Sequence, residues 1–349
     1  MSKKLLTLCS LLFLLPVLSL SGCLPKNSAG PRAVADDPVF LAELTALHAK
    51  GKTIIVAPSS GPSAASAGAS FELAEKINAC LPRASLQADG VPYHAAPDTV
   101  RLHMLGEALT DPDARVVWAL RGGYGAGRLL PELAKLPAPN RNVILVGYSD
   151  ITFLHLFMHT HALQTVHGSM VFELANPNKD PENFYLLSAL LAGALPELSY
   201  GGLEPLNHAA RQMSGPVSGI FTGGNLACFT ATAGTPWMPD TTGKILFFED
   251  VDEGGHRVDR MFTQLRQAGV FDGVKAVVLG SFTDGDNNTS FALERFADEM
   301  DKPVFTTDQF GHGSKNYPLV LNAPASVEPE PGGTFRLRIE TKNLRTAQK

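Results

Sequence analysis

Three residues of the types that perform nucleophilic catalysis lie far apart in this chain. Ser149 follows the apolar run Val143–Val146 after only Gly147 and Tyr148, in "VGYSDITFLH", and a helical pattern starts at once. Glu249 ends a strand-like run in "ILFFEDVDE", and His312 lies between two glycines in "FGHGSKNYP". A hydroxyl nucleophile, an imidazole base and a carboxylate that orients the base are the parts of a serine hydrolase triad. The fold would have to bring them together.

Ser149 by itself has two interpretations. A serine at a sharp turn from a buried strand into a helix is held exposed, and the N–H groups of the helix start can receive an oxyanion. The stretch is not G-x-S-x-G, however, because Ile151 stands where the second glycine belongs. Serine is also a favoured helix N-cap residue. The residues alone leave a nucleophile and an N-cap equally open.

A second glycine-rich stretch, "LRGGYGAGRLL" over Leu120–Leu130, also reads as a strand-to-helix loop. Such a loop could donate backbone N–H groups to an oxyanion, or it could be a phosphate loop or simply a tight turn. It lacks the Gly-Lys-Ser/Thr ending of a P-loop, and its glycines are not spaced as G-x-G-x-x-G. The loop therefore does not match either common phosphate-binding motif, and the oxyanion donor and the tight turn stay open.

The elements that must position these residues alternate between strands and helices. This order, with near-continuous apolar strands, predicts a parallel sheet covered on both faces, with ligands at the carboxyl ends of its strands. The expected strands are 53–57, 85–88, 116–120 and 143–146, and the expected helices are 71–81, 99–109, 128–134 and 150–160.

The second half of the chain has a different pattern of strands and helices, and this pattern predicts a smaller α/β domain or a barrel-like sheet. Its expected strands are 245–248, 274–279, 304–306 and 334–339, and its expected helices are 258–267 and 291–300. The resulting division of the chain is a signal peptide over 1–22, a lipidated tether over 23–45, an N-terminal domain over 46–192, a linker over 193–214 and a C-terminal domain over 215–345.

The N-terminus has the pattern of an export signal. Lys3 and Lys4 precede an apolar run that is broken by Pro16 and ends in "LSGC" at Cys23. A positive start, a short apolar segment and small residues before a cleavage point are typical of a secretory signal. The "LSGC" ending resembles the lipobox of bacterial lipoproteins, which implies that Cys23 is lipidated. Since Leu24 is not the Asp that retains some lipoproteins in the inner membrane, we expect a periplasmic protein anchored to the outer membrane.

The net charge and the cysteine content indicate which partners and which disulfides to expect. The formal net charge is −5, which argues against nucleic acid as a partner, because nonspecific binding to it depends on neutralising phosphates. Cys80 and Cys228 would remain in the mature chain beside Cys23. We expect them to be two buried free thiols, although an oxidising compartment would permit a disulfide.

Taken together, several motifs resemble those of the LD-carboxypeptidase family of serine peptidases. These are "APSSGPS", "LRGGYGAGRLL", "VGYSDITFLH", "VHGSM", "GGNLA", "FFEDVDE" with "RVDRMFTQL", and "FGHG", in family order over about residues 50–340. The resemblance implies an N-terminal Rossmann-like parallel-sheet domain and a smaller C-terminal β-barrel-like α/β domain. It also implies release of the terminal D-alanine from peptidoglycan stem tetrapeptides without a metal or organic cofactor, and it suggests a homodimer.

The resemblance also implies roles for particular residues. Ser149 would be the nucleophile, His312 the base and Glu249 its orienting partner. The nearby acids Asp250, Asp252 and Glu253 make the choice of carboxylate the least secure. The remaining roles implied are an oxyanion hole of backbone N–H groups from Asp150 and from Gly122 or Gly123, and substrate contacts from Tyr124, Gly224 and Asn225. Ser169 and Asn322 depart from residues common in the family and put specificity in doubt more than chemistry.

Two rival functions stay open. Four histidines (His155, His159, His161 and His167) lie within thirteen residues, and the first two could share a helix face as zinc ligands do. No H-E-x-x-H motif and no neighbouring carboxylate accompany them, so we expect no metal site. The second rival is a lipoprotein that binds cell-wall peptide without cutting it. An exported enzyme could in addition cut LD bonds within crosslinked stems.

Overall fold

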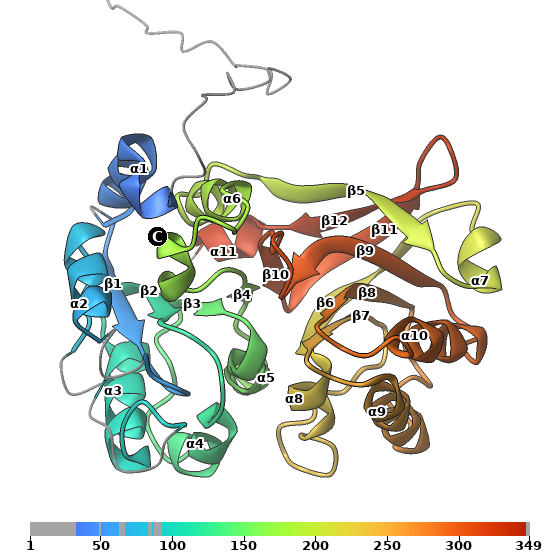
Figure 1. The fold of residues 1–349 in the computed structure, drawn as a ribbon, viewed down its shortest axis with the longest axis horizontal. Coiled ribbons are helices and arrows are strands. Elements are labelled where there is room, and N and C mark those ends of the chain that lie inside the picture. The colour runs from blue at the N-terminus through green and yellow to red at the C-terminus, as the bar shows by residue number, and fades with distance from the viewer. Residues whose placement is uncertain (1–32, 49, 63–66, 83–85, 87–92, 347–349) are drawn as a thin grey trace, which may run out of the picture. The chain divides into compact units, whose positions relative to one another are not determined.

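A computed structural model describes residues 33–48, 50–62, 67–82, 86 and 93–346 (Figure 1). The signal peptide, Cys23 and most of the weak strand expected over 85–88 lie outside the described residues. In the described part of the chain, no helix is both long enough and apolar enough to span a bilayer.

The strands of the described residues form two sheets. The first has the order β1-β2-β3-β4-β10, in which β1 to β4 are parallel and β10 is antiparallel to β4. Its strands are β1 (Lys52–Val56), β2 (Ala114–Ala119), β3 (Ile144–Gly147), β4 (Thr165–His167) and β10 (Leu319–Leu321). This confirms the predicted parallel-sheet domain.

The second sheet closes into a seven-stranded barrel of order β11-β12-β5-β9-β8-β7-β6, which confirms the predicted barrel-like domain. Strands β6 to β9 are parallel and the others antiparallel. The strands are β5 (Glu197–Pro205), β6 (Val217–Asn225), β7 (Lys244–Val251), β8 (Ala276–Thr283), β9 (Val304–Gly311), β11 (Ala323–Pro329) and β12 (Phe335–Glu340). Both sheets lie within one compact unit.

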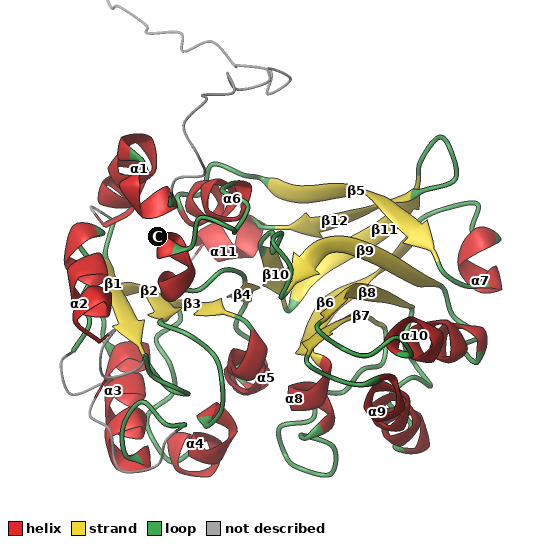
Figure 2. Ribbon diagram, viewed as in Figure 1, coloured by secondary structure: helices red, strands yellow, loops and turns green. Residues whose placement is uncertain are grey.

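Helices cover both faces of the first sheet and one side of the barrel (Figure 2). The α-helices are α1 (Pro38–His48), α2 (Ala67–Lys76), α3 (Asp98–Thr110), α4 (Ala126–Leu133), α5 (Thr152–Thr160), α6 (Glu182–Leu191), α7 (His208–Arg211), α8 (Leu226–Thr230), α9 (Gly255–Gln267), α10 (Thr289–Asp298) and α11 (Lys342–Thr346). Short 3-10 helices are η1 (Val34–Asp36), η3 (Ser149–Ile151) and η4 (Val171–Ala175).

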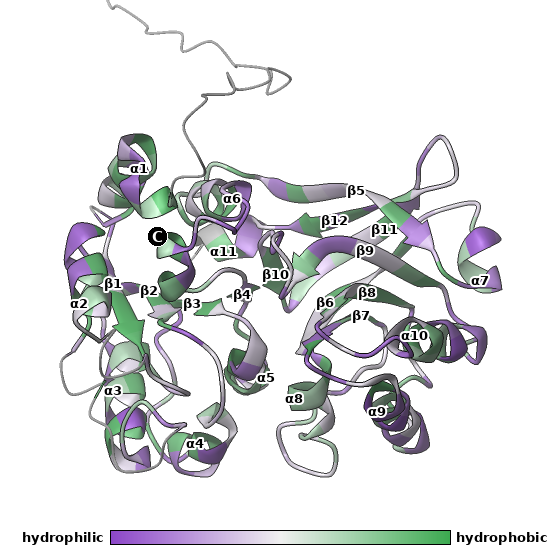
Figure 3. Cartoon of the chain, in the orientation of Figure 1, coloured by the Kyte–Doolittle hydropathy of each residue, from purple (hydrophilic) through white to green (hydrophobic). Residues whose placement is uncertain are grey.

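The apolar pattern of each strand follows from this covering. In β1, Ile54 and Val56 pack with α3, α4 and α5, whereas Ile55 packs with α1, α2 and α6. Both faces are buried after Lys52, which is why Ile54, Ile55 and Val56 form a continuous apolar run. Helix α9 is largely hydrophilic in Figure 3 and buries only one stripe, with Val258, Phe262 and Leu265, against the barrel. Such a stripe is what a surface helix requires.

Two segments that were expected to be connections are part of the fold. Within the expected tether, α1 begins at Pro38, because Phe40, Leu44 and Leu47 recur on one helix face and are buried in the core. Within the expected linker 193–214, β5 pairs with β12 and β9 and closes the barrel. In β5 the buried apolar residues Leu198, Tyr200 and Leu203 stand singly among polar residues and glycines. The sequence therefore gives only a weak indication of a strand there.

Asn207, also in the expected linker, joins β5 to the rest of the barrel domain. Its buried amide nitrogen lies 3.0, 3.2 and 2.8 Å from the carbonyl oxygens of Ala297, Met300 and Lys302, so its two hydrogens are shared among three acceptors. Its side-chain oxygen accepts from the N–H groups of Ala210 and Val304. One side chain thus satisfies five backbone groups of three separate segments.

We expect Asn207→Ala to destabilise the protein by about 3 kcal/mol or more, because several buried backbone groups lose their partner at once. Urea unfolding followed by circular dichroism measures the loss. The exposed Asn287 provides the control, and Asn287→Ala should change the free energy of unfolding by less than about 0.5 kcal/mol. Equal effects of the two substitutions would contradict the assigned role of Asn207.

Candidate active site

Ser149 lies at a turn that leaves no room for a loop. β3 ends at Gly147, Tyr148 is the N-cap residue of η3, and Ser149 is the first residue of η3. The N-cap interpretation of Ser149 is therefore wrong. Its φ of 63° is left-handed, a conformation that costs a residue with a Cβ about 1–2 kcal/mol. A serine kept in this conformation projects its side chain away from the strand axis.

The glycine-rich loop between β2 and α4 lies directly against Ser149. A Cβ placed on Gly122 would lie 2.9 Å from the Ser149 Cβ, 3.0 Å from its Oγ and 3.5 Å from the Asp150 nitrogen. Only a residue without a side chain fits at this distance. Gly122 and the backbone of Asp150 therefore border the same small space beside the serine hydroxyl.

The side chain of Asp150 fixes the loop in this position. Its Oδ2 accepts a 2.8 Å hydrogen bond from the N–H of Ala126, the first residue of α4. The carboxyl is buried, and burial raises its pKa against the opposing effects of its hydrogen bonds and of Arg101. Farther along the loop, Gly123 has a φ of 103° and approaches Ser60, whose Oγ accepts from the Tyr124 N–H.

Glu249 and His312 lie at the ends of two barrel strands. Glu249 lies near the end of β7, and His312 follows the last residue of β9. The Nδ1 of His312 and the Oε2 of Glu249 are 2.5 Å apart, and the Glu249 side chain is fully buried. The β7–β8 ladder shifts register between Phe248 and Asp250. Such an irregularity re-aims a side chain, and here it lies at Glu249.

The other acids of this stretch have different partners. Asp250 accepts from the Asn225 amide at 2.7 Å and from the Ala227 N–H at 2.9 Å, and burial with the Glu249 charge raises its pKa to about 6. Glu253 forms a surface ion pair with Arg257. The geometry therefore selects Glu249 as the partner of His312.

The surroundings of His312 stabilise the protonated form of its imidazole relative to a free histidine. Burial lowers the pKa of His312, but the charge and hydrogen bond of Glu249 outweigh it, with smaller contributions from Asp250 and Glu173. The net pKa lies above the ordinary value. Because Nδ1 faces Glu249, Nε2 is the nitrogen left to exchange a proton with a reacting group.

Tyr148 brings the two halves of the site together. Its ring centroid is 4.7 Å from that of His312, and Ser149 is its neighbour in the chain. A second junction lies behind the site, where the Asn225 N–H donates to the Thr152 Oγ1 at 3.0 Å. Gly224 approaches the same threonine so closely that a Cβ would lie 2.5 Å from Thr152 Oγ1.

The residues expected to bind substrate lie in two environments. Tyr124 is exposed, with its ring stacked on His94 at 5.9 Å and edge-on to Tyr93 at 5.5 Å. Asn225 is buried, and its amide bonds Asp250 while its oxygen caps α8 by accepting from the Cys228 N–H. Gly224 adjoins Asn225 at the junction with Thr152.

Sequence reasoning missed three residues of the site. Tyr148 packs on the base, and its hydroxyl donates to Glu173 at 2.8 Å. Glu173 pairs with Lys179 at 2.8 Å. The signal that could have revealed Glu173 is a single acid in the apolar stretch "SMVFELA", since an acid in such surroundings is rarely buried without a partner. Lys179, in a polar loop, gave no signal.

The histidine cluster is not arranged as a metal site. His155 and His167 are buried, and His155 Nε2 is 2.9 Å from the Gly147 carbonyl oxygen. Burial lowers the pKa of both rings, to about 4 for His155. Over the residues with a described placement, no group of three or more His, Cys, Asp or Glu side chains could hold a metal ion. Cys80 and Cys228 are free thiols, and Cys80 is exposed rather than buried as expected.

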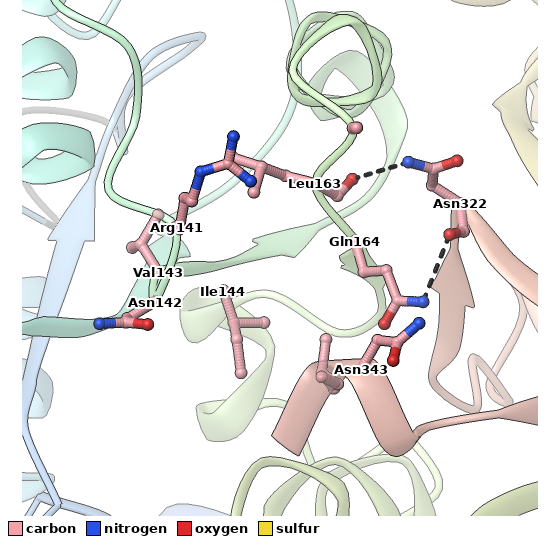
Figure 4. A pocket seen from close by; sticks show the side chains of 10 residues that line it. Arg141, Asn142, Val143, Ile144, Leu163, Gln164, Asn322 and Asn343 are labelled. Atoms are coloured by element: carbon pink, nitrogen blue, oxygen red, sulfur yellow. Dashed lines mark hydrogen bonds between the residues drawn. The ribbon is translucent and has the colours of Figure 1, made fainter. Parts of the chain in front are cut away.

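A cavity of about 150 Å³ lies at the opposite end of β3 (Figure 4). It is lined by Ile144, the first residue of β3, and by Asn322, which has a left-handed φ of 59°. Figure 4 shows the Asn322 amide donating to the Leu163 carbonyl and the Asn322 carbonyl accepting from Gln164, both at 3.3 Å. The departure from the family at Asn322 therefore lies away from Ser149.

Comparison with known proteins agrees with the resemblance seen in the sequence. Residues 54–168 match the LD-carboxypeptidase N-terminal domain, and residues 218–327 match the C-terminal domain. A putative carboxypeptidase of Rickettsia conorii is 42% identical over 68% of this chain and 75% of its own length. The murein tetrapeptide carboxypeptidase of Pseudomonas aeruginosa is 34% identical over 66% of this chain and 82% of its own length.

Solved structures agree as well. The muramoyltetrapeptide carboxypeptidase from Oxalobacter formigenes has 27% identity and a TM-score of 0.70, covering 83% of this chain and 98% of its own. The microcin C7 self-immunity protein MccF, at 21% identity and a TM-score of 0.67, covers 83% and 96% and shares the fold. The fold and site define a peptidase of two domains. The chain belongs to the LD-carboxypeptidase family.

We expect Gly122→Ala to slow the reaction of Ser149 with a fluorophosphonate probe by at least tenfold, because the new methyl group would displace the serine or the loop. Gly68→Ala is the matched control, since a Cβ there meets nothing within 4 Å and alanine suits the helix interior. Equal labelling rates for the Gly122 variant and the parent would show that this close contact does not shape the site.

Proposed function

We propose that this protein is a serine-type murein tetrapeptide LD-carboxypeptidase, which releases the terminal D-alanine from peptidoglycan stem tetrapeptides. The observation that carries the proposal is the 2.5 Å contact between His312 and the buried Glu249, placed against Tyr148 beside the left-handed Ser149. We infer the substrate from the names of the relatives from Pseudomonas aeruginosa and Oxalobacter formigenes.

In this mechanism the Ser149 Oγ attacks the carbonyl carbon of the bond to D-alanine while His312 Nε2 takes the hydroxyl proton. The resulting oxyanion is received by the N–H groups of Asp150 and of Gly122 or Gly123, and one such donor typically contributes about 3–4 kcal/mol. His312 then gives its proton to the leaving amine of D-alanine. A water molecule attacks the acyl-serine, His312 takes its proton, and the tripeptide leaves as Ser149 is restored.

Glu249 has two tasks in this scheme. Its hydrogen bond to Nδ1 fixes the tautomer that leaves Nε2 free to accept a proton from Ser149. Its negative charge stabilises the imidazolium that forms in each half-reaction. Apart from the attacking water, the scheme uses only side chains and backbone groups of the chain itself.

The direct test uses the mature domain without its anchor and a purified muropeptide tetrapeptide, analysed by mass spectrometry. We expect loss of one alanine by the parent, and a fall in kcat of at least about 10⁴-fold for Ser149→Ala because the nucleophile is gone. Ser281→Ala, in β8, is the control and should stay active. An intact tetrapeptide with the parent would refute the substrate, and a fluorophosphonate adduct on Ser149 would separate a hydrolase from a binding protein.

The pH dependence of the reaction follows from the raised pKa of His312. The neutral imidazole is the active base, so kcat/KM should fall on the acid side with a midpoint above about 6.5. Glu249→Gln removes the largest influence that raises the pKa, so the midpoint should move to lower pH while the rate falls on the order of 10³-fold or more. A midpoint unmoved by Glu249→Gln would argue against their coupling.

We also propose that Cys23 is lipidated and holds the enzyme at the periplasmic face of the outer membrane, where it would meet stem peptides of the sacculus. The "LSGC" motif and the preceding apolar segment support this. Fractionation of cells that produce the parent or Cys23→Ser tests it, since the variant should leave the membrane fraction. Light scattering of the mature chain tests the homodimer that the resemblance implies.

A further inference from the structure

Glu173 is a wholly buried acid that the chemistry proposed above does not use. It lies in η4, and its Oε2 accepts from the Met170 N–H at 2.8 Å. Its Oε1 accepts from the Tyr148 hydroxyl at 2.8 Å and faces the Lys179 ammonium at 2.8 Å. Burying a charged pair gives little net stability compared with apolar residues of the same size. Net stability therefore does not explain why this buried charged pair lies beside the site.

Lys179 extends the pair to the loop that carries the base. Its ammonium donates to the Gly313 carbonyl at 2.8 Å and lies 3.4 Å from the His312 carbonyl oxygen. The Lys179 side chain is only 12% exposed. A shielded ammonium that binds two carbonyls and a carboxylate is held in one place, because each of its donors is directed to a fixed acceptor.

These contacts close a ring that runs from Tyr148, the chain neighbour of Ser149, to the His312 side chain. Tyr148, the neighbour of Ser149, bonds Glu173; Glu173 bonds Lys179; and Lys179 bonds the backbone of His312 and Gly313. The imidazole of His312 packs back on the Tyr148 ring at 4.7 Å. The ring joins the β3 turn of the parallel sheet to the loop after β9 of the barrel.

We propose that Lys179 and Glu173 are positioning residues, which hold the His312 loop of the barrel at the correct distance from the Ser149 turn of the sheet. His312 is fixed by Glu249 within the barrel, but that contact does not set its place relative to a nucleophile on another sheet. A displacement of about 1 Å can lower a rate on the order of 10²-fold. The proposal rests on the proposed function, in which His312 activates Ser149.

Lys179→Met tests the proposal, because it keeps the apolar stem and removes the ammonium. We expect kcat for the muropeptide tetrapeptide to fall by at least tenfold with KM within about threefold of the parent, and probe labelling of Ser149 to slow in parallel. Lys315→Met is the matched control, since Lys315 lies in the loop after β9 that carries His312 but binds only the exposed Asp308 among the contacts seen. It should leave kcat within about twofold.

The double variant Glu173→Gln/Lys179→Met guards against an effect of folding alone. It removes both charges, so no unpaired carboxylate is left buried, and its melting temperature should approach that of the parent. We expect its kcat to stay at least tenfold low, because Gly313 still lacks its donor. Parental kcat in a folded Lys179→Met or in the double variant would overturn the proposal, whereas a parent without hydrolysis would refute the proposed function instead.

Discussion

The buried carboxylate of Glu249 is the constraint around which the site is arranged. An ionised carboxylate removed from water is costly unless a partner of opposite charge or a hydrogen-bond donor meets it. His312 is that partner, and the surrounding chain leaves room for the contact. A Cβ on Gly311 would lie 3.0 Å from the Glu249 Cβ and 3.1 Å from its Oε2, and Gly280 is almost as near. The missing side chains at Gly280 and Gly311, together with the shift in strand register, thus leave space for the Glu249 carboxylate at the end of an apolar strand.

The nucleophile depends on a corresponding close approach in the parallel sheet. Ser149 accepts a left-handed backbone, and Gly122 lies where any side chain would strike it. Asp150 stabilises the arrangement by accepting from the first N–H of α4. The left-handed backbone at Ser149 and the missing side chain at Gly122 together keep open the space beside the partly buried Ser149 hydroxyl.

Neither sheet contains the whole candidate site, because Ser149 follows a strand of the parallel sheet whereas Glu249 and His312 belong to the barrel. Thr152 and Asn225 join them behind the site, and Tyr148 packs on His312 within it. The chain also crosses between the sheets, since β10 pairs with β4 although its neighbours β9 and β11 belong to the barrel. This crossing limits how far one sheet can move against the other, and the Glu173–Lys179 pair adds a polar connection close to the base.

The sequence by itself determined the parallel sheet, because strands buried on both faces are apolar at every position, as 116–120 and 143–146 are. The combination of motifs around Gly122, Ser149, Glu249 and His312 determined the family. Tertiary structure decided the features that depend on contacts between residues far apart in the sequence. The segment of β5 and helix α1 belong to the fold only because distant partners cover their few apolar residues. The choice of Glu249 over Asp250, and the contacts of Glu173 with Lys179, depend on which distant groups come near. These contacts depend on which distant residues are buried together and pair with one another. The spacing of residues along the sequence does not contain that information.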